Sequence, residues 1–217
     1  MERQEVVSRL VQSGAVGIIR VQENEDLVRI AHALQAGGLK CVEITMNSVG
    51  ALHAIEKARR DLPDIIMGAG TVLDGATARH AILAGAEFIV TPTVEPDVIE
   101  MAHRYGVVII PGAMSPTEIL TAWELGVDMV KVFPADVLGP AYLKAIHGPL
   151  SQIPLAPTGG ITANNAGEFI KAGAAIVSAG GWLVNKKAII EGRYEEITKR
   201  AQQLIQAVKE ARGESGE

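Results

Sequence analysis

Two charged side chains stand inside apolar runs of the sequence, where both are placed to do chemistry. Lys131 lies in the run Met129–Pro134, and Glu43 lies in the run Cys41–Thr45. Burial disfavours an ammonium ion and lowers the pKa of a lysine, which makes its amine a nucleophile near neutral pH. Such an amine attacks carbonyl carbons and forms Schiff bases. A solvent-facing edge lysine is the alternative, but the apolar flanks and the proline that ends the run favour a buried, reactive Lys131.

Strand geometry decides whether the two charged groups can meet. Side chains alternate along a strand, so Cys41, Glu43 and Thr45 share one face of theirs, while Lys131 and Phe133 share a face of another. If both faces point inward, the carboxyl group lies near the amine. A purely structural ion pair is the alternative, yet a buried pair costs desolvation and is weak evidence for stability. We favour a proton-transferring carboxyl group beside a nucleophilic amine.

Composition limits the class of protein and its partners. The chain has 217 residues, of which 48% are hydrophobic, and its net charge of −5 includes no basic block, so no nucleic acid partner is expected. One cysteine, Cys41, leaves no disulfide framework within the chain and indicates a reducing compartment, the cytoplasm. Glycine, proline or charge interrupts each apolar run below membrane-spanning length, so no membrane partner is expected.

The elements that must position these residues repeat along the chain. After a short helix at 3–13, eight units follow, each with an apolar strand, a loop and an amphipathic helix. The predicted strands are 16–19, 41–45, 65–69, 88–90, 107–110, 129–133, 155–157 and 175–178, and the predicted helices are about 25–36, 48–60, 74–84, 95–105, 115–125, 140–147, 162–172 and 194–210. Eight units predict an α/β fold, a single-domain (β/α)8 TIM barrel over residues 1–210 with an N-terminal capping helix, followed by a polar tail at 211–217. An open doubly wound sheet is the alternative, but no glycine-rich fingerprint follows the first strand.

In such barrels the active site lies at the C-terminal ends of the strands. The residues expected there, besides the charged pair, are Arg20, Thr45, Asn47, Gly70, Thr71, Thr91, Pro92, Thr158, Gly159, Gly160, Gly180 and Gly181. An arginine in this place either binds a carboxylate or phosphate or is an exposed loop residue. The two glycine pairs let backbone N–H groups approach an anion, although such pairs are also ordinary turn chemistry. All five histidines fall on predicted helices, so no metal site is expected.

Five stretches at the predicted strand ends together resemble the KDPG/KHG aldolase family, the 2-keto-3-deoxy-6-phosphogluconate and 4-hydroxy-2-oxoglutarate aldolases. They are Val42–Thr45, Gly68–Leu73, Thr91–Pro92, Lys131–Ala135 and Pro157–Ile161, and the resemblance extends over about residues 5–205. It implies a class I lyase that reversibly cleaves a 2-keto-3-deoxy-(6-phospho)sugar acid such as KDPG, or 4-hydroxy-2-oxoglutarate, to pyruvate and glyceraldehyde 3-phosphate or glyoxylate. It also implies Entner–Doudoroff carbohydrate metabolism, no metal or other cofactor, a cytoplasmic location and a homotrimer.

The resemblance also implies roles for individual residues. Lys131 forms the Schiff base, and Glu43 moves protons through a water. The remaining residues that the resemblance places around the substrate are Thr71 at the pyruvate, Pro92 and Phe133 as walls of the pocket, and Thr158, Gly159 and Gly160 at the substrate and phosphate.

Two positions depart from the family pattern. Asn47 stands where many KDPG aldolases carry an arginine for the pyruvate carboxylate. Asn47 and Ser48 together with Arg20 look more like the 2-keto-3-deoxy-6-phosphogalactonate aldolases, in which Arg20 would take the carboxylate. Gly181 replaces a serine often found in the phosphate turn, so the requirement for phosphate stays open. A phosphate-binding barrel isomerase or epimerase without imine chemistry, and a non-catalytic barrel oligomer, are the remaining alternatives.

Overall fold

The computed structural model describes residues 1–21 and 26–214. Its elements in chain order are α1 (Arg3–Ser13), β1 (Ala15–Ile19), α2 (Leu27–Ala36), β2 (Cys41–Thr45), α3 (Ala51–Asp61), β3 (Ile66–Gly70), α4 (Gly75–Leu83), β4 (Phe88–Val90), α5 (Pro96–Tyr105), β5 (Val108–Ile110), β6 (Gly112–Ala113), α6 (Pro116–Glu124), β7 (Val130–Val132), α7 (Ala135–His147), β8 (Leu155–Pro157), α8 (Ala163–Lys171), β9 (Val177–Ala179), α9 (Lys186–Ile190) and α10 (Tyr194–Arg212). Every residue of these strands is buried, as expected for a parallel sheet covered on both sides.

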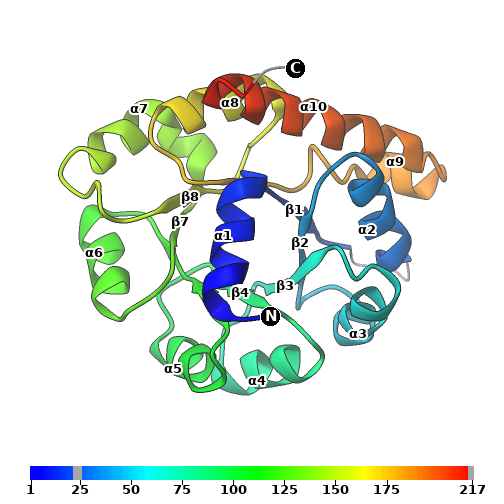
Figure 1. Ribbon diagram of the computed structural model, residues 1–217, viewed down its shortest axis with the longest axis horizontal. Helices are drawn as coiled ribbons and strands as arrows, with labels where there is room; N and C mark the ends of the chain where they lie inside the picture. The colour runs from blue at the N-terminus through cyan, green and yellow to red at the C-terminus, as the bar shows by residue number, and fades with distance from the viewer. Residues whose placement is uncertain (22–25, 215–217) are drawn as a thin grey trace.

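The fold is of the α/β class, built on a curled parallel sheet. Strands β5, β4, β3, β2, β1 and β9 pair in that order, and β6, β7 and β8 form a second parallel ladder. Only Pro111 separates β5 from β6, because a proline has no N–H to offer the ladder. The isolated parallel bridges Leu155–Ala174 and Thr158–Ser178 lie between β8 and β9. Figure 1 shows the helices arranged around the outside of the strands, with α1 across the middle of the view.

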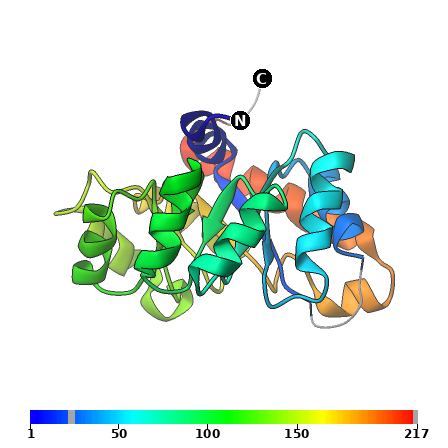
Figure 2. The same cartoon turned by 90° about the horizontal axis from the view of Figure 1, so that it is seen from below.

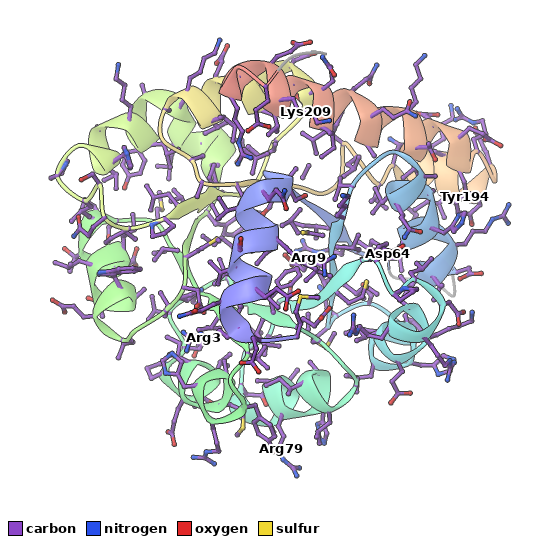
Figure 3. The ribbon with its side chains drawn as sticks, in the orientation of Figure 1. Arg3, Arg9, Asp64, Arg79, Tyr194 and Lys209 are labelled. Carbon is purple, nitrogen blue, oxygen red and sulfur yellow. The ribbon has the colours of Figure 1, made fainter. Side chains whose placement is uncertain are left out.

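The helix α1 lies beyond one end of the strands, as the turned view in Figure 2 shows. Its side chains Val6 and Leu10 are buried in an apolar cluster with residues that lie in the strands or next to a strand in sequence. These residues are Val16, Cys41, Ile66, Phe88, Val90, Val108, Ile110, Met129, Ala156 and Ile176. Two arginines fasten the helix from its polar side, since Arg3 pairs with Asp128 at 2.8 Å and Arg9 donates to the carbonyl of Asp64 at 2.9 Å (Figure 3).

Several predicted element ends are confirmed by the hydrogen bonds that cap the helices. Asp74 caps α4, and Ser115 and Thr162 each form a capping box at the start of α6 and α8. The short helix α9 was not predicted, and α10 ends at Arg212, two residues beyond the predicted end. Residue 25, the predicted start of the helix that is observed as α2, and residues 215–217 of the predicted tail lie outside the described residues. None of the described helices is long and apolar enough to cross a membrane.

Candidate active site

Lys131 lies in the middle of β7, where its side chain is only 5% exposed. The strand pairs Lys131 with Gly112 on one side and with Ala156 on the other. Met129, two residues earlier, belongs to the interior cluster, so the alternation of a strand directs the lysine to the same interior. Burial lowers the pKa of Lys131, the Glu43 carboxyl group opposes this shift, and Arg20 adds to it. The amine is therefore more available as a neutral nucleophile than an exposed lysine would be.

Glu43 lies in the middle of β2, with 2% of its surface exposed. Burial raises the pKa of its carboxyl group, while the charges of Lys131 and Arg20 act to lower it. The neighbouring strand β3 makes the room for this side chain, because a Cβ atom on Gly70 would stand 1.7 Å from Glu43 Oε1. The requirement for a glycine at this position was not predicted, since it depends on the register of β2 and β3.

The pKa shifts of Glu43 and Lys131 have opposite directions and the same main cause. Desolvation favours the protonated acid and the neutral amine, whereas the attraction between the two groups favours the ion pair. The balance between these two effects therefore decides which of the two groups holds the proton. A site of this kind can supply a nucleophilic amine and an adjacent proton donor in one step, and their conjugate forms in the next.

Arg20 follows β1 and reaches across to the loop after β3. Its Nη2 donates to Thr71 Oγ1 at 3.5 Å, the long limit of a hydrogen bond. Thr71 has a φ of 56°, an unusual left-handed conformation for a β-branched residue. Backbone bonds hold this conformation from both sides, since Met46 N–H donates to the carbonyl of Gly70 at 2.8 Å and Val72 N–H donates to that of Val90 at 3.2 Å. Strain of this type is retained where the surrounding structure fixes it, commonly at functional sites.

A cavity of about 470 Å³ opens at the carboxyl ends of β1, β8 and β9. Its lining residues are Ile18, Arg20, Phe133, Thr158, Gly159, Gly160, Gly180, Gly181, Val184, Asn185 and Lys186. The Phe133 ring connects this space to the buried amine, because the Lys131 Nζ lies 5.0 Å from the centre of the ring. Gly160 has a φ of 64°, and a Cβ there would stand 2.4 Å from the Cβ of Asp136, so no larger residue fits. At its four glycines the cavity lining has no side chain, so a ligand can approach the backbone there, which suits an anion.

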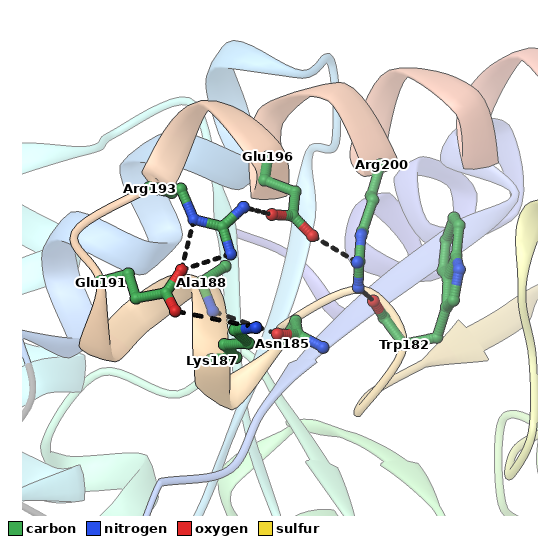
Figure 4. A network of polar contacts seen from close by, with 8 residues as sticks. All are labelled: Trp182, Asn185, Lys187, Ala188, Glu191, Arg193, Glu196 and Arg200. Carbon is green, nitrogen blue, oxygen red and sulfur yellow. Dashed lines mark hydrogen bonds and ion pairs between the residues drawn. The ribbon is translucent and has the colours of Figure 1, made fainter.

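The segment after β9, which forms one wall of the cavity, is held from outside by α10. Figure 4 shows the network, made of the side chains of Glu191, Arg193, Glu196 and Arg200. Arg200 donates to the carbonyl oxygen of Trp182 and lies over its ring, 5.8 Å from the centre. Asn185 caps α9 by accepting from Ala188 N–H at 3.1 Å. Trp182 packs against the core.

The predicted site residues fall into three groups. The cavity brings together seven of them, which are Arg20, Phe133, Thr158, Gly159, Gly160, Gly180 and Gly181. Lys131 and Glu43 lie in the adjoining interior, and Thr71 is bonded to Arg20. None of the remaining three lines the cavity: Thr45 is fully buried at the end of β2, Pro92 packs its carbonyl against Gly112, and Asn47 is exposed.

The sequence did not reveal Ile18, Val184, Asn185 and Lys186 as lining residues. Ile18 offered a signal, since it stands two residues before Arg20 and therefore shares a strand face with it; the structure pairs it with Glu43. Cys41 belongs to the interior cluster, and burial raises the pKa of its thiol to about 11, so it is a packed core residue and not a nucleophile. Within residues 1–21 and 26–214, no three His, Cys, Asp or Glu side chains gather to hold a metal ion.

Fold and site together define an α/β protein whose polar groups gather at the carboxyl ends of parallel strands. The chain belongs to the KDPG and KHG aldolase family, whose model matches residues 6–200. A relative from Treponema pallidum, named 2-dehydro-3-deoxy-phosphogluconate aldolase, is 38% identical over 194 residues, which cover 89% of this chain and 92% of the relative.

Solved structures give the same family. One described as a native KDPGal structure has a TM-score of 0.84 and 31% identity, covering 92% of this chain and 96% of that chain. Another, the KDPG aldolase from Legionella pneumophila with pyruvate captured as a covalent carbinolamine intermediate, has a TM-score of 0.84 and 30% identity, covering 91% and 97% of the two chains. The resemblance read from the sequence is therefore confirmed.

Proposed function

We propose that this protein is a class I aldolase that reversibly cleaves a 2-keto-3-deoxy-(6-phospho)sugar acid, or 4-hydroxy-2-oxoglutarate, to pyruvate and an aldehyde. The observation that carries the proposal is the buried Lys131 amine, whose pKa is lowered by burial beside the equally buried Glu43. A relative of known structure holds pyruvate as a covalent carbinolamine, the adduct that precedes a Schiff base.

In the proposed reaction the Lys131 amine adds to the C2 carbonyl carbon of the substrate. Loss of water from the carbinolamine gives the protonated imine, and the C4 hydroxyl then loses its proton as the C3–C4 bond breaks. The electron pair of that bond passes into the imine and leaves the enamine of pyruvate on Lys131. Protonation at C3 and hydrolysis release pyruvate and restore the amine. Glu43 is the group placed to give and take these protons, directly or through a water. The reaction needs no external cofactor.

The cavity supports an anionic substrate. Arg20 and Lys186 are the charged side chains among the lining residues, and the Gly159–Gly160 and Gly180–Gly181 pairs expose backbone along its wall. We assign the keto-acid carboxylate to Arg20, because Arg20 lines the cavity and its charge acts on both Lys131 and Glu43, whereas Asn47 does not line the cavity. Thr71 is hydrogen-bonded to Arg20, while Phe133 and Thr158 form part of the cavity wall.

The use of Arg20 instead of Asn47 favours a 6-phosphogalactonate-type substrate as the second candidate. The structural neighbour described as KDPGal is consistent with this choice. The two sugar acids differ in configuration at C4, so the ratio of kcat/KM for the two substrates distinguishes the candidates.

The proposal also includes the fold, the oligomeric state and the cellular location of the enzyme. We infer that residues 1–210 form one (β/α)8 barrel, closed through Pro111 and the bridges between β8 and β9, with α1 covering its lower end. The polar tail expected at 211–217 overlaps α10 at its first two residues, Ala211 and Arg212. A homotrimer in the cytoplasm is the assembly and location that follow from the family.

A coupled assay of pyruvate release tests the function. Wild-type protein should release pyruvate from at least one of KDPG, its C4 epimer and 4-hydroxy-2-oxoglutarate. Lys131→Met should reduce release to background, while Lys144→Met, which changes an exposed lysine of α7, should leave it unchanged. Isomerisation of the substrate without pyruvate release would favour the barrel isomerase, and full activity of Lys131→Met would exclude the imine mechanism.

A further inference from the structure

Ser48 links the two peptide groups on either side of Arg20. Its Oγ accepts a hydrogen bond from Val21 N–H at 3.1 Å and lies 3.0 Å from Thr45 Oγ1. Thr45 Oγ1 in turn donates to the carbonyl oxygen of Ile19 at 3.3 Å. The carbonyl of Ile19 belongs to the peptide that precedes Arg20, and the N–H of Val21 belongs to the peptide that follows it.

The direction of every bond in this chain is fixed by donor count. The single Thr45 hydroxyl proton goes to the Ile19 carbonyl, which cannot donate. The Ser48 hydroxyl must then donate to Thr45 Oγ1, which leaves Ser48 Oγ to accept from Val21 N–H. One continuous chain of hydrogen bonds therefore runs from Val21 through both hydroxyl groups to Ile19.

The network is buried although the arginine that it surrounds is exposed. Thr45 is 0% and Ser48 is 6% exposed, so water competes little for these bonds. The N–H of Ser48 closes the turn in which this residue lies, because it donates to the carbonyl of Thr45 at 2.9 Å. The same turn leaves the intervening Asn47 exposed. The end of β2 and the turn after it thus hold the backbone on both sides of Arg20, and the Arg20 side chain extends from there to Thr71.

We propose that Ser48 is a positioning residue, which with Thr45 holds the Arg20 backbone so that the guanidinium group binds the keto-acid carboxylate. This inference rests on the proposed function in that the ligand of Arg20 is the carboxylate of pyruvate or of the sugar acid. Ser48 touches neither the substrate nor the reacting atoms in this role. It acts only through Arg20, and this dependence can be measured.

The test is the pyruvate concentration that half-saturates reductive trapping by borohydride, followed by intact mass. Ser48→Ala should raise this concentration roughly tenfold, in keeping with the loss caused by small misplacements of a binding group. The maximal extent of trapping should stay near that of wild type, because Lys131 and Glu43 are unchanged. Ser13→Ala is the matched control, since Ser13 Oγ donates to the Ala15 carbonyl at 3.0 Å at the opposite end of β1. This control should leave half-saturation unchanged.

A double-mutant cycle separates positioning from a general structural role. In an Arg20→Met background, Ser48→Ala should have no further effect on half-saturation, because the group that it positions is gone. Thr45→Val, which removes the other hydroxyl of the network, should behave in the same way and serves if Ser48→Ala does not fold. A tenfold effect of Ser48→Ala that persists without Arg20, or no effect beyond that of Ser13→Ala, would overturn the inference. A wild-type protein that traps no pyruvate would instead overturn the proposed function and, with it, the substrate role given to Ser48.

Discussion

Gly70→Ala should displace the carboxyl group of Glu43, to which we assign the proton transfers, without changing that group chemically. The added Cβ would stand 1.7 Å from Glu43 Oε1, 2.3 Å from Cδ and 2.6 Å from Cγ, whereas real Cβ atoms keep at least 3.0 Å from other groups. The Oε1 atom must therefore move by about 1.3 Å, the difference between these two distances. General acid–base catalysis contributes about 10²–10⁴-fold, and a displacement near 1 Å costs about 10²-fold. We expect kcat for aldol cleavage to fall by at least about 10²-fold.

The assay combines cleavage with exchange of the pyruvate methyl protons in D₂O. Exchange requires the enamine and a group that returns a proton to C3, so it reports on Glu43 without any aldehyde partner. Gly148→Ala is the control, because its new Cβ would lie 3.6 Å from its nearest neighbour, the carbonyl of Ala145, at an ordinary contact distance. Thermal unfolding of both variants should be recorded, since overpacking alone typically costs about 1–3 kcal/mol of stability.

Unchanged cleavage and exchange rates in a folded Gly70→Ala protein would refute the role of Glu43. The carboxyl group cannot keep its position beside the new methyl group, so such a result would mean that another group moves the protons.

Three further predictions follow from the titration of buried groups. Burial lowers the pKa of Lys131 from 10.5, so borohydride trapping of pyruvate should persist well below pH 10.5. Trapping should decline only as the pH falls through the lowered pKa. A trapping profile that rises only near pH 10.5 would contradict this prediction. The raised pKa of Glu43 means that the folded protein binds this proton more tightly than the unfolded chain, whose carboxyl group titrates near 4.5, so the carboxyl group reduces stability as the pH rises above 4.5. Glu43→Gln should therefore raise the unfolding temperature at pH 8 but not at pH 4, and an equal effect at both values would exclude the desolvation account. Since burial raises the pKa of Cys41 to about 11, a thiol reagent at pH 8 should label it only after unfolding, and rapid labelling of the native protein would show that the thiol is accessible.

The sequence predicted the buried pair of Lys131 and Glu43 because both residues break a strong local rule. A charged side chain in a short apolar run is costly unless it is paired or used, and two-residue periodicity then fixes the face on which it lies. Lys131 and Glu43 are indeed buried within β7 and β2, and each acts on the pKa of the other. The helix caps at Asp74, Ser115 and Thr162 were also predictable from local sequence, because each cap depends on residues within three positions along the chain.

The sequence could not predict features that depend on distances between strands. Gly70 is required because Glu43 lies beside it in the register of β2 and β3, and no local pattern states that register. Ser48 looked like the start of a helix, but a turn buries it against the end of β1. The helix α9 has only five residues, too few to show a helical period.

Intact-mass spectrometry after incubation with pyruvate and borohydride, followed by peptide mapping, tests the central claim most directly. The account predicts a single reduced pyruvate adduct on Lys131, formed by the wild type and by Lys144→Met but not by Lys131→Met. An adduct on a different lysine, or no adduct on the folded protein, would contradict it.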